Sequence, residues 1–313
     1  MAAPAISPTA PGRRAPGWRR RITYALGALA FCVLLYLALG ALLAWNSMRP
    51  KRRSFTQTPA QYAFAYTDIT FLSRDRTRLS GWYIPAAHRC PRGVIVLCHG
   101  IDGSRQSTLR HAPFLHAAGF AMVLFDFRAR GQSGGRICTL GLREPEDLLA
   151  AVRWVEERPE LKGLPIGVLG ASLGASTAIM AAAREARILA VVAEAPFSQL
   201  DRAVDCNFQE ICGGAAPFFA LPTMWVGQAV LRKWGRDISP LREIAAISPR
   251  PVLIIEDAGD TLFPQRETRA LYAAARSPKE LWTVPDAGHC AASYVAPDEY
   301  HRRVTQFFTA NLK

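Results

Sequence analysis

The sequence predicts an α/β protein: a mostly parallel, doubly wound sheet with a small helical cap, preceded by one transmembrane helix. From about Thr67 to the C-terminus, short apolar runs alternate with stretches of helical length, which is typical of a parallel sheet covered on both faces. The connection between Ala193 and Pro251 is much longer than a crossover needs, which indicates an insertion above the sheet. Residues 22–45 form an uncharged apolar run of about 36 Å as a helix, enough to span a bilayer core.

The expected elements can be placed in order along the chain. An antiparallel pair of strands opens the sheet, and about 240 residues in all are enough for one domain with a large core. The predicted strands cover 66–72, 78–84, 94–98, 121–125, 166–169, 189–193, 252–255 and 281–284, and the predicted helices cover 107–118, 145–157, 173–184, 265–275 and 298–311.

The most informative motif is Gly170-Ala171-Ser172-Leu173-Gly174, which stands between an apolar strand and a helix. A strand, a sharp turn and a helix around G-x-S-x-G form a nucleophile elbow, in which the serine oxygen is exposed at the top of a sheet. The turn strains the serine backbone and brings neighbouring chain close, so the flanking residues must be small. The motif therefore predicts Ser172 as the nucleophile.

A serine nucleophile needs a histidine base and an acid that orients it, in the chain order Ser, acid, His. Asp257 and Asp260 both follow the strand at 252–255, and we favour Asp260 because its loop would direct the carboxylate over the sheet edge. Asp257 stays an alternative, although a turn-forming role suits it better. His289 is the candidate base because it follows the last predicted strand.

The backbone after the strand at 94–98 has a predicted role in binding the oxyanion. The N–H of Leu173, directly after the nucleophile, supplies one donor, and the N–H of Ile101 supplies the other. His99 begins this loop, and we expect it to brace the loop and not to carry a proton.

Taken together, these motifs resemble the α/β-hydrolase superfamily, and more closely its serine-hydrolase branch with S33 aminopeptidase-like and monoacylglycerol-lipase-like proteins. The resemblance runs from about Thr67 to the C-terminus. It includes the elbow, the His99-Gly100 loop, the acid loop from Asp260 to Pro264, Gly288-His289, and a D-x-R-G-x-G-x-S-like segment from Asp126 to Ser133. The chain departs from the pattern at Ala129, where a glycine is usual, and at Glu256-Asp257, where relatives often have His-Gly.

The resemblance implies an α/β-hydrolase fold over residues 66–313 and a serine hydrolase. We expect cleavage of carboxylic esters or thioesters of a small-molecule or lipid acyl substrate. An S33-like peptidase is the alternative, with Glu194 or Glu210 as anchor for a free amine, and a catalytically silent binding or scaffold protein is a third. No cysteine and histidine spacing indicates a metal site, and no cofactor is expected.

The cap is expected at about residues 197–245. Two prolines, Pro217 and Pro222, divide it into short helices. Its aromatic side chains either line an apolar acyl pocket or pack the cap onto the body. They are Phe197, Phe208, Phe218, Phe219, Trp225 and Trp234.

The N-terminal region carries most of the charge. The net charge is +13, and residues 1–53 contain nine Lys or Arg and no acid, which leaves +4 on the remainder. This distribution suits a basic tail at residues 1–21 and a membrane flank after the span, and it does not predict nucleic-acid binding. Five basic residues precede the span and four follow it, which slightly favours a cytoplasmic N-terminus and an extracytoplasmic catalytic domain.

We read residues 46–65 as a linker and therefore expect the anchor to determine location and not chemistry. In this interpretation every predicted catalytic residue follows the linker. Cys206 and Cys212, both in the cap, would be able to pair in an oxidising compartment.

Overall fold

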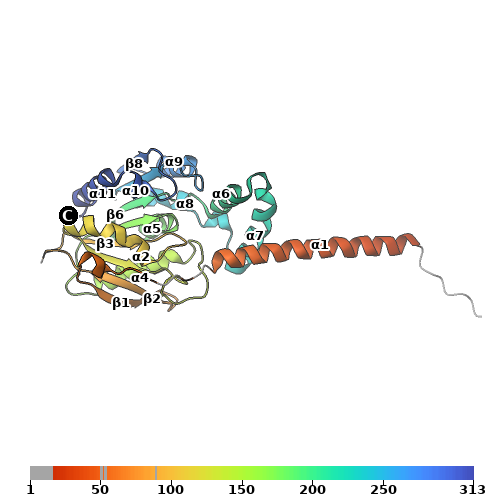
Figure 1. Cartoon of the computed structure of the whole chain (residues 1–313), viewed down its shortest axis with the longest axis horizontal. Coiled ribbons are helices and arrows are strands. Elements are labelled where there is room, and N and C mark those ends of the chain that lie inside the picture. The colour runs from red at the N-terminus through yellow and green to blue at the C-terminus, as the bar shows by residue number, and fades with distance from the viewer. Residues whose placement is uncertain (1–16, 50–51, 53–54, 89) are drawn as a thin grey trace, which may run out of the picture.

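The structure is a computed structural model that describes residues 17–49, 52, 55–88 and 90–313 (Figure 1). Most of the basic tail predicted for residues 1–21 lies outside the described residues, as do Lys51 and Arg53 beyond the span.

The sheet has eight strands in the order β1-β2-β4-β3-β5-β6-β7-β8. β1 pairs with β2 and β2 with β4 in antiparallel fashion, and every other neighbouring pair is parallel. This is the mostly parallel sheet with an antiparallel opening that the sequence predicts. The strands are β1 Thr67–Leu72, β2 Arg78–Ile84, β3 Val94–Cys98, β4 Ala121–Phe125, β5 Ile166–Ala171, β6 Ile188–Glu194, β7 Val252–Asp257 and β8 Lys279–Val284.

Helices cover both faces of the sheet. One buried cluster joins the sheet to α4, α5 and α9, and a second joins it to α3 and α11. Central strands such as β3 and β4 are therefore buried at every position, which explains their continuous apolar sequences. The body helices are α2 Arg105–Thr108, α3 Ala112–Ala117, α4 Glu144–Glu156, α5 Leu173–Arg184, α8 Pro240–Glu243, α9 Gln265–Ala274, α10 Ala292–Val295 and α11 Pro297–Asn311, and the short 3-10 helices are η1 Pro59–Tyr62, η2 Leu109–His111, η3 Gly213–Ala215, η4 Gly235–Asp237 and η5 Ile244–Ile247.

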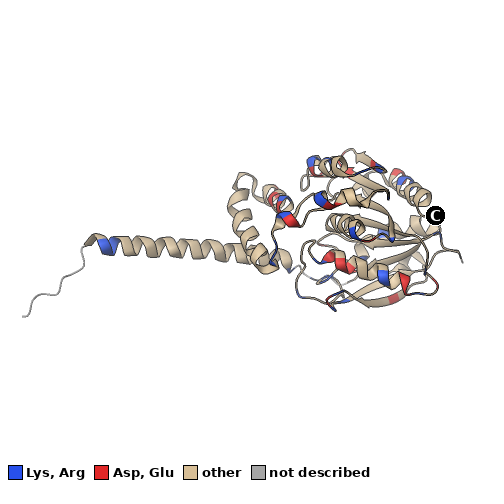
Figure 2. Ribbon diagram, turned by 180° about the vertical axis from the view of Figure 1, so that it is seen from behind, with Lys and Arg blue, Asp and Glu red and all other residues tan. Residues whose placement is uncertain are grey.

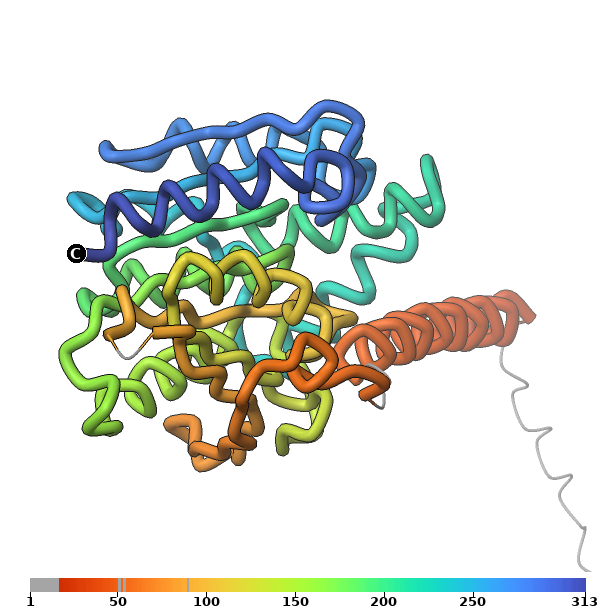
Figure 3. The backbone as a smooth tube through the Cα atoms, turned by 60° about the vertical axis from the view of Figure 1, so that its left-hand side comes forward, coloured from red at the N-terminus to blue at the C-terminus, as the bar shows by residue number. Residues whose placement is uncertain are grey.

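The long insertion between β6 and β7 forms a helical hairpin, α6 (Leu200–Cys212) and α7 (Ala216–Leu231), joined by η3. Its tip leaves the body on the side from which α1 (Gly17–Met48) also projects, as Figures 1 and 3 show. Pro222 lies inside α7 and does not end it, so the cap has two main helices where the prolines suggested several short ones.

The helix α1 contains the predicted span at residues 22–45 and extends beyond it at both ends. Its best window has a mean hydropathy of 2.5 and only 6% of it is buried, so by length and composition α1 is a candidate membrane anchor. The hairpin at Leu200–Leu231 also passes this test, with a mean hydropathy of 1.2.

The segment predicted as a linker, residues 46–65, makes contacts with the body. α1 continues to Met48, and the Met48 carbonyl accepts a hydrogen bond from the Cys138 N–H at 2.8 Å. The Arg52 guanidinium donates to three carbonyls of one loop, and the Thr56 N–H donates to Gln106 Oε1 at 2.8 Å. Arginine has five hydrogen-bond donors, so a single side chain can bind several carbonyls of one loop. The basic and polar composition of the segment does not reveal these contacts.

The two cap cysteines do not pair. Cys206 and Cys212 both lie in α6 and both are free. Six residues along one helix separate Cα atoms by about 9 Å, beyond the reach of a disulfide. The sequence-based suggestion of a Cys206–Cys212 bridge is therefore wrong.

Candidate active site

Ser172 lies in the strained turn between β5 and α5. Its φ is 55° and its ψ is −119°, a combination of backbone dihedral angles that residues other than glycine rarely adopt. A Cβ on Gly170 would lie 2.4 Å from the Gly174 carbonyl oxygen, and one on Gly174 would lie 2.3 Å from the Cys98 oxygen. Both glycines are thus required by close backbone approach, as the motif indicates, and together they present the Ser172 side chain beyond the carboxyl end of β5.

His289 and Asp260 meet Ser172 from the loops that follow β8 and β7. His289 Nε2 lies 2.9 Å from Ser172 Oγ, and His289 Nδ1 lies 2.7 Å from Asp260 Oδ2. The other Asp260 oxygen accepts hydrogen bonds from the N–H groups of Leu262 and Phe263, both at 2.9 Å. These bonds fix the carboxylate so that it faces the imidazole, and the three residues form a continuous chain of hydrogen bonds.

Asp257, the alternative acid, makes a different contact. Its Oδ2 accepts a hydrogen bond from the Cys290 N–H at 2.8 Å, so it supports the histidine loop through the backbone. Burial raises the pKa of Asp257 to about 8, and the nearby Glu194 carboxyl adds to this effect. A largely protonated acid that does not reach the imidazole is less suited to orient it, and the geometry favours Asp260.

The loop after β3 passes directly over the elbow. A Cβ on Gly100 would lie 3.3 Å from Ser172 Cβ, and Ile101 lines the same cavity as Ser172 and Leu173. Leu173 begins α5, where an N–H has no partner within the helix. The two predicted oxyanion donors, Ile101 and Leu173, therefore belong to two backbone segments that both lie next to the serine.

His99 holds this loop against the neighbouring strand end. The Phe127 N–H donates to His99 Nε2 at 3.0 Å, so the proton is on Nδ1, which donates to the Gly100 carbonyl at 2.7 Å. Burial lowers the pKa of His99 to about 4, and the ring is neutral at physiological pH. Both nitrogens are occupied, which agrees with the expected bracing role.

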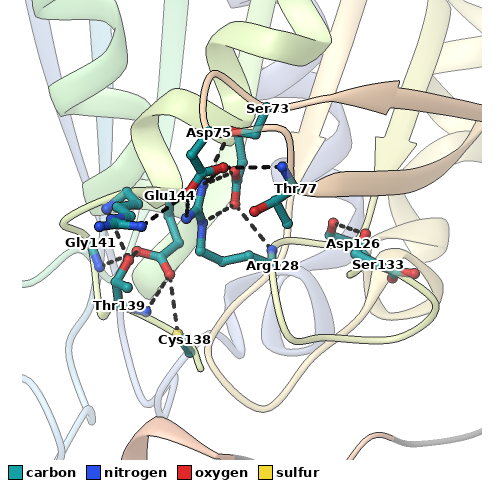
Figure 4. A network of polar contacts seen from close by, with 12 residues as sticks. Ser73, Asp75, Thr77, Asp126, Arg128, Ser133, Cys138, Thr139, Gly141 and Glu144 are labelled. Carbon is teal, nitrogen blue, oxygen red and sulfur yellow. Dashed lines mark hydrogen bonds and ion pairs between the residues drawn. The ribbon is translucent and has the colours of Figure 1, made fainter. Parts of the chain in front are cut away.

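The Asp126–Ser133 segment forms a rigid turn beside this loop. Gly131 has a φ of 41°, and a Cβ there would lie 2.2 Å from Asp126 Oδ2. Ala129 also has a positive φ, 58°, so the residue that replaces the usual glycine keeps the left-handed backbone. Arg128 is buried and donates to both oxygens of Asp147 and to Asp75, which ties the turn to α4 and to the β1–β2 hairpin (Figure 4).

Glu144 organises the next loop, which the sequence analysis did not single out. Its fully buried carboxylate accepts hydrogen bonds from the Thr139 and Gly141 N–H groups, both at 2.7 Å, and from the Thr139 hydroxyl at 2.8 Å (Figure 4). The same loop presents the Cys138 N–H to the end of α1 and the Leu140 side chain to the cavity beside Ser172. An acid followed by proline at the start of a helix is the only local signal of this role.

A cavity of about 610 Å³ extends from Ser172 between the body, the cap and α1. Of the six cap aromatics named from the sequence, Phe197 and Phe208 line it, while the other four do not. The last turns of α1 also line it, so the end of the predicted anchor lies beside the predicted catalytic residues. The apolar lining residues are Ala44, Met48, Ile101, Leu140, Leu173, Phe197, Leu200, Ala203, Val204, Phe208, Met224, Leu231, Leu262 and Phe263.

The two glutamates predicted as amine anchors do not line this cavity. Glu194 is fully buried and accepts hydrogen bonds from the Ala292 N–H and the Tyr300 hydroxyl. Glu210 accepts a bond from Thr261 on the surface. The carboxylates in the cavity lining are those of Asp102 and Asp201, which no sequence motif singles out.

The sequence of this chain is similar to one protein family and to several individual proteins. The family described as X-Pro dipeptidyl-peptidase (S15 family) matches residues 40–208, slightly more than half of the chain. The uncharacterized protein YfhR of Salmonella typhi is 28% identical over 288 residues, covering 87% of this chain and 90% of the relative. The uncharacterized protein Rv2307c of Mycobacterium tuberculosis is 31% identical over 222 residues, covering 71% of this chain and 72% of the relative.

Solved structures show the same fold. An esterase of Pyrococcus furiosus, Pf2001, superimposes with a TM-score of 0.72 and 28% identity, covering 85% of this chain and 98% of that chain. An acylaminoacyl peptidase of Pyrococcus horikoshii gives a TM-score of 0.61 at 19% identity, covering 80% of this chain and 42% of that chain. The predicted α/β-hydrolase fold is thus confirmed, whereas the S33-like branch stays a prediction.

Proposed function

Since the chain belongs to the family described as X-Pro dipeptidyl-peptidase (S15 family), on the α/β-hydrolase fold, we propose that it is a membrane-anchored serine hydrolase that cleaves carboxylic ester or thioester bonds of acyl substrates. At the coarser level it is a hydrolase of the esterase or peptidase type. The observation that carries the proposal is the hydrogen-bonded chain from Ser172 through His289 to Asp260 at one end of a mostly apolar cavity.

In the proposed mechanism, Ser172 Oγ attacks the acyl carbonyl carbon and His289 Nε2 takes the serine proton. Asp260 keeps the proton of Nδ1 in place and stabilises the imidazolium that forms. The Ile101 and Leu173 N–H groups bind the oxyanion, and His289 then protonates the leaving alcohol or thiol. Water attacks the acyl-enzyme with His289 as base, which releases the carboxylic acid and restores Ser172.

The cavity lining and the similarity to an esterase both support an acyl substrate. Apolar side chains from the body, the cap and α1 surround the space beyond Ser172. Such a lining suits a hydrocarbon chain, and polar residues of the same cavity, such as Arg49, Asp201 and Lys233, would be able to orient a polar part of the substrate. The esterase Pf2001 aligns over almost its whole length at 28% identity.

A serine peptidase is the second candidate, because the S15 family is described by a dipeptidyl-peptidase activity. Such an enzyme needs an anion for the free amino terminus of its substrate. Asp102 and Asp201 are carboxylates in the cavity lining and are the candidates for this role.

The proposal includes the anchor and its orientation. We propose that α1 spans the membrane once and that the catalytic domain lies on the extracytoplasmic side, which the slight excess of basic residues before the span supports. A phosphatase that is active only after export, fused to the C-terminus, should be active. An inactive fusion in cells that make the full-length protein would contradict the orientation.

The central test compares Ser172→Ala with wild type. We expect wild type to react with a fluorophosphonate probe and to hydrolyse p-nitrophenyl butyrate, and we expect the variant to lose the labelling and about 1,000-fold or more in turnover. Ser277→Ala, at an exposed position before β8 on the opposite edge of the sheet, is the control and should match wild type.

Substrate panels then separate the two enzyme classes. Higher kcat/KM on acyl esters than on X-Pro dipeptide amides supports the esterase, and the reverse supports the peptidase. A wild-type protein that neither reacts with the probe nor hydrolyses any of these substrates is a silent scaffold.

A further inference from the structure

The end of the anchor helix is part of the substrate cavity. Ala44 and Met48 on α1 are buried and line the space that contains Ser172, and Asn46, Ser47 and Arg49 join them. The Cys138 N–H donates a hydrogen bond to the Met48 carbonyl oxygen at an N···O distance of 2.8 Å, so the last turn of α1 has a fixed position on the body. A helix that served only to hold the enzyme at the membrane would have no need of these contacts.

The helix α7 packs directly against α1 and forms the adjoining wall. A Cβ on Gly40 would lie 2.5 Å from the Pro222 backbone, so a glycine is needed where the helices meet. The rings of Tyr36 and Phe218 lie 5.0 Å apart, one turn earlier on both helices. Both helices therefore run towards the body along this contact. Small residues such as Gly40 and Ala44, four positions apart, are typical of close helix contacts in membranes.

The outer surfaces of these two helices are apolar and largely exposed in the described part of the chain. Phe218, Leu221 and Trp225 lie on one face of α7, and 41% to 56% of their surface is exposed. α7 contains no charged residue, and neither does α1 from residue 22 to its end. Figure 2 shows both helices free of charge where they lie together. The first cations after each helix are Arg49 and Arg232, which suit the membrane surface.

The hairpin is long enough to enter one leaflet and not to cross the bilayer. Tyr36, which contacts the start of α7, lies 12 residues before Met48, or about 18 Å along the helix axis. Half of a hydrocarbon core of about 30 Å is about 15 Å. Glu210, near the end of α6, accepts a hydrogen bond from Thr261 of the body, so α6 lies along the protein surface. The apolar Leu200–Leu231 segment is therefore a hairpin with one lipid-facing helix, α7.

We propose that α7 lies in the lipid leaflet beside α1, and that the acyl chain of a bilayer-resident ester reaches Ser172 along the wall that these two helices form. The occupant of the exposed α7 face is the hydrocarbon of the membrane, and the substrate is an amphiphile whose acyl chain never leaves an apolar environment. α1 is thereby a wall of the substrate site as well as an anchor. This inference rests on the proposed hydrolase function, of which it specifies the substrate class and the route of access.

The first test changes the contact between α1 and α7. Gly40→Leu should displace α7, whereas Gly27→Leu, at a position where no described atom lies within 4 Å of a Cβ, should not. Both variants are compared on 4-methylumbelliferyl acetate in solution and on 4-methylumbelliferyl oleate in phosphatidylcholine vesicles, which share one leaving group. We expect the oleate-to-acetate rate ratio to fall at least tenfold for Gly40→Leu and to stay constant for Gly27→Leu.

An unchanged ratio for Gly40→Leu would overturn the proposal, whether the separate rates stay the same or fall together. Failure of the underlying function has a different signature. If Ser172→Ala hydrolysed both esters at the wild-type rate, the proposed nucleophile would be wrong whatever the Gly40→Leu ratio.

The second test detects the lipid contact without measuring activity. Full-length protein in phosphatidylcholine vesicles carries the photo-crosslinker p-benzoylphenylalanine in place of Trp225, which is 52% exposed. Leu34 on α1 and Leu72 on β1 are the positive and negative control positions, with 64% and 57% exposure. We expect lipid adducts at positions 225 and 34 and none at 72. Adducts at 34 alone would show that α7 lies outside the bilayer.

Discussion

The carboxyl edge of the sheet and the α7 wall of the cap face each other across one cavity, yet different forces hold them. At the sheet edge, polar groups are buried and bonded: Asp260 accepts two backbone N–H groups, and Glu144 binds a whole loop. The α7 wall has apolar side chains and a single side-chain hydrogen bond in its own helix, from Thr223 to the Phe219 carbonyl. The edge thus fixes atomic positions for chemistry, whereas the wall offers a surface that only an apolar partner can cover.

The largest expected effect concerns the two acids at the sheet edge. Asp260→Asn should lower kcat on p-nitrophenyl butyrate about ten-thousand-fold, because an amide cannot hold the imidazole in the required tautomer. Asp257→Asn should lower it less than about tenfold, since Asp257 bonds the Cys290 backbone instead. Steady-state kinetics of both variants decides the matter. If both variants lost the same factor in kcat, the direct contact of Asp260 with His289 would matter no more than the contact of Asp257 with the Cys290 backbone.

Substitution of one glycine in each region should sharpen the contrast in packing. Gly174→Ala puts a methyl group against the Cys98 carbonyl and should reduce the free energy of unfolding by about 2–3 kcal/mol. A Cβ on Gly227 in α7 would have no described atom within 4 Å. Gly227→Ala should therefore raise the free energy of unfolding by up to about 1 kcal/mol, because alanine has the higher helix propensity. Thermal unfolding in detergent micelles measures both. A large loss at Gly227 would indicate that the cap is as tightly packed as the elbow.

The smallest expected effect is a pH dependence at the sheet edge. Burial raises the pKa of Asp257 to about 8 in the folded protein, against about 3.9 in the unfolded chain. Between these values the folded state binds more protons, so stability falls as the pH rises, by about 1 kcal/mol between pH 6 and pH 7. Asp257→Asn should flatten this decline in denaturant titrations at the two pH values. Parallel slopes for the variant and wild type would place the titrating group elsewhere.

The residues of the sheet edge were predictable because their signals are local. The elbow requires Gly170 and Gly174 within one turn, and Asp260 and His289 each follow an apolar strand at a short distance. Chain order then brings them together, since parallel strands end at the same edge of the sheet. The choice between Asp257 and Asp260 needed the three-dimensional contacts, because both residues follow β7.

The role of α1 in the cavity was not predictable in the same way. It depends on contacts of Gly40, Ala44 and Met48 with α7 and with the loop at Cys138, all of them distant in sequence. An apolar stretch of bilayer length has the same composition whether lipid or protein covers its end. The pair of small residues at positions 40 and 44, in a segment rich in leucine, was the available signal that one face meets another helix.

The hydrogen bond from the Cys138 N–H to the Met48 carbonyl has a consequence for the proposed placement of the protein at a membrane. Glu144 fixes the loop that carries Cys138, and Arg52 binds the neighbouring turn through three carbonyls. These contacts hold the α/β body in a fixed orientation relative to α1, so the tilt of the body follows the tilt of this helix. If α1 spans the membrane as proposed, Ser172 would stand at a constant height above the headgroups, and a change in bilayer thickness would move the scissile bond relative to the serine.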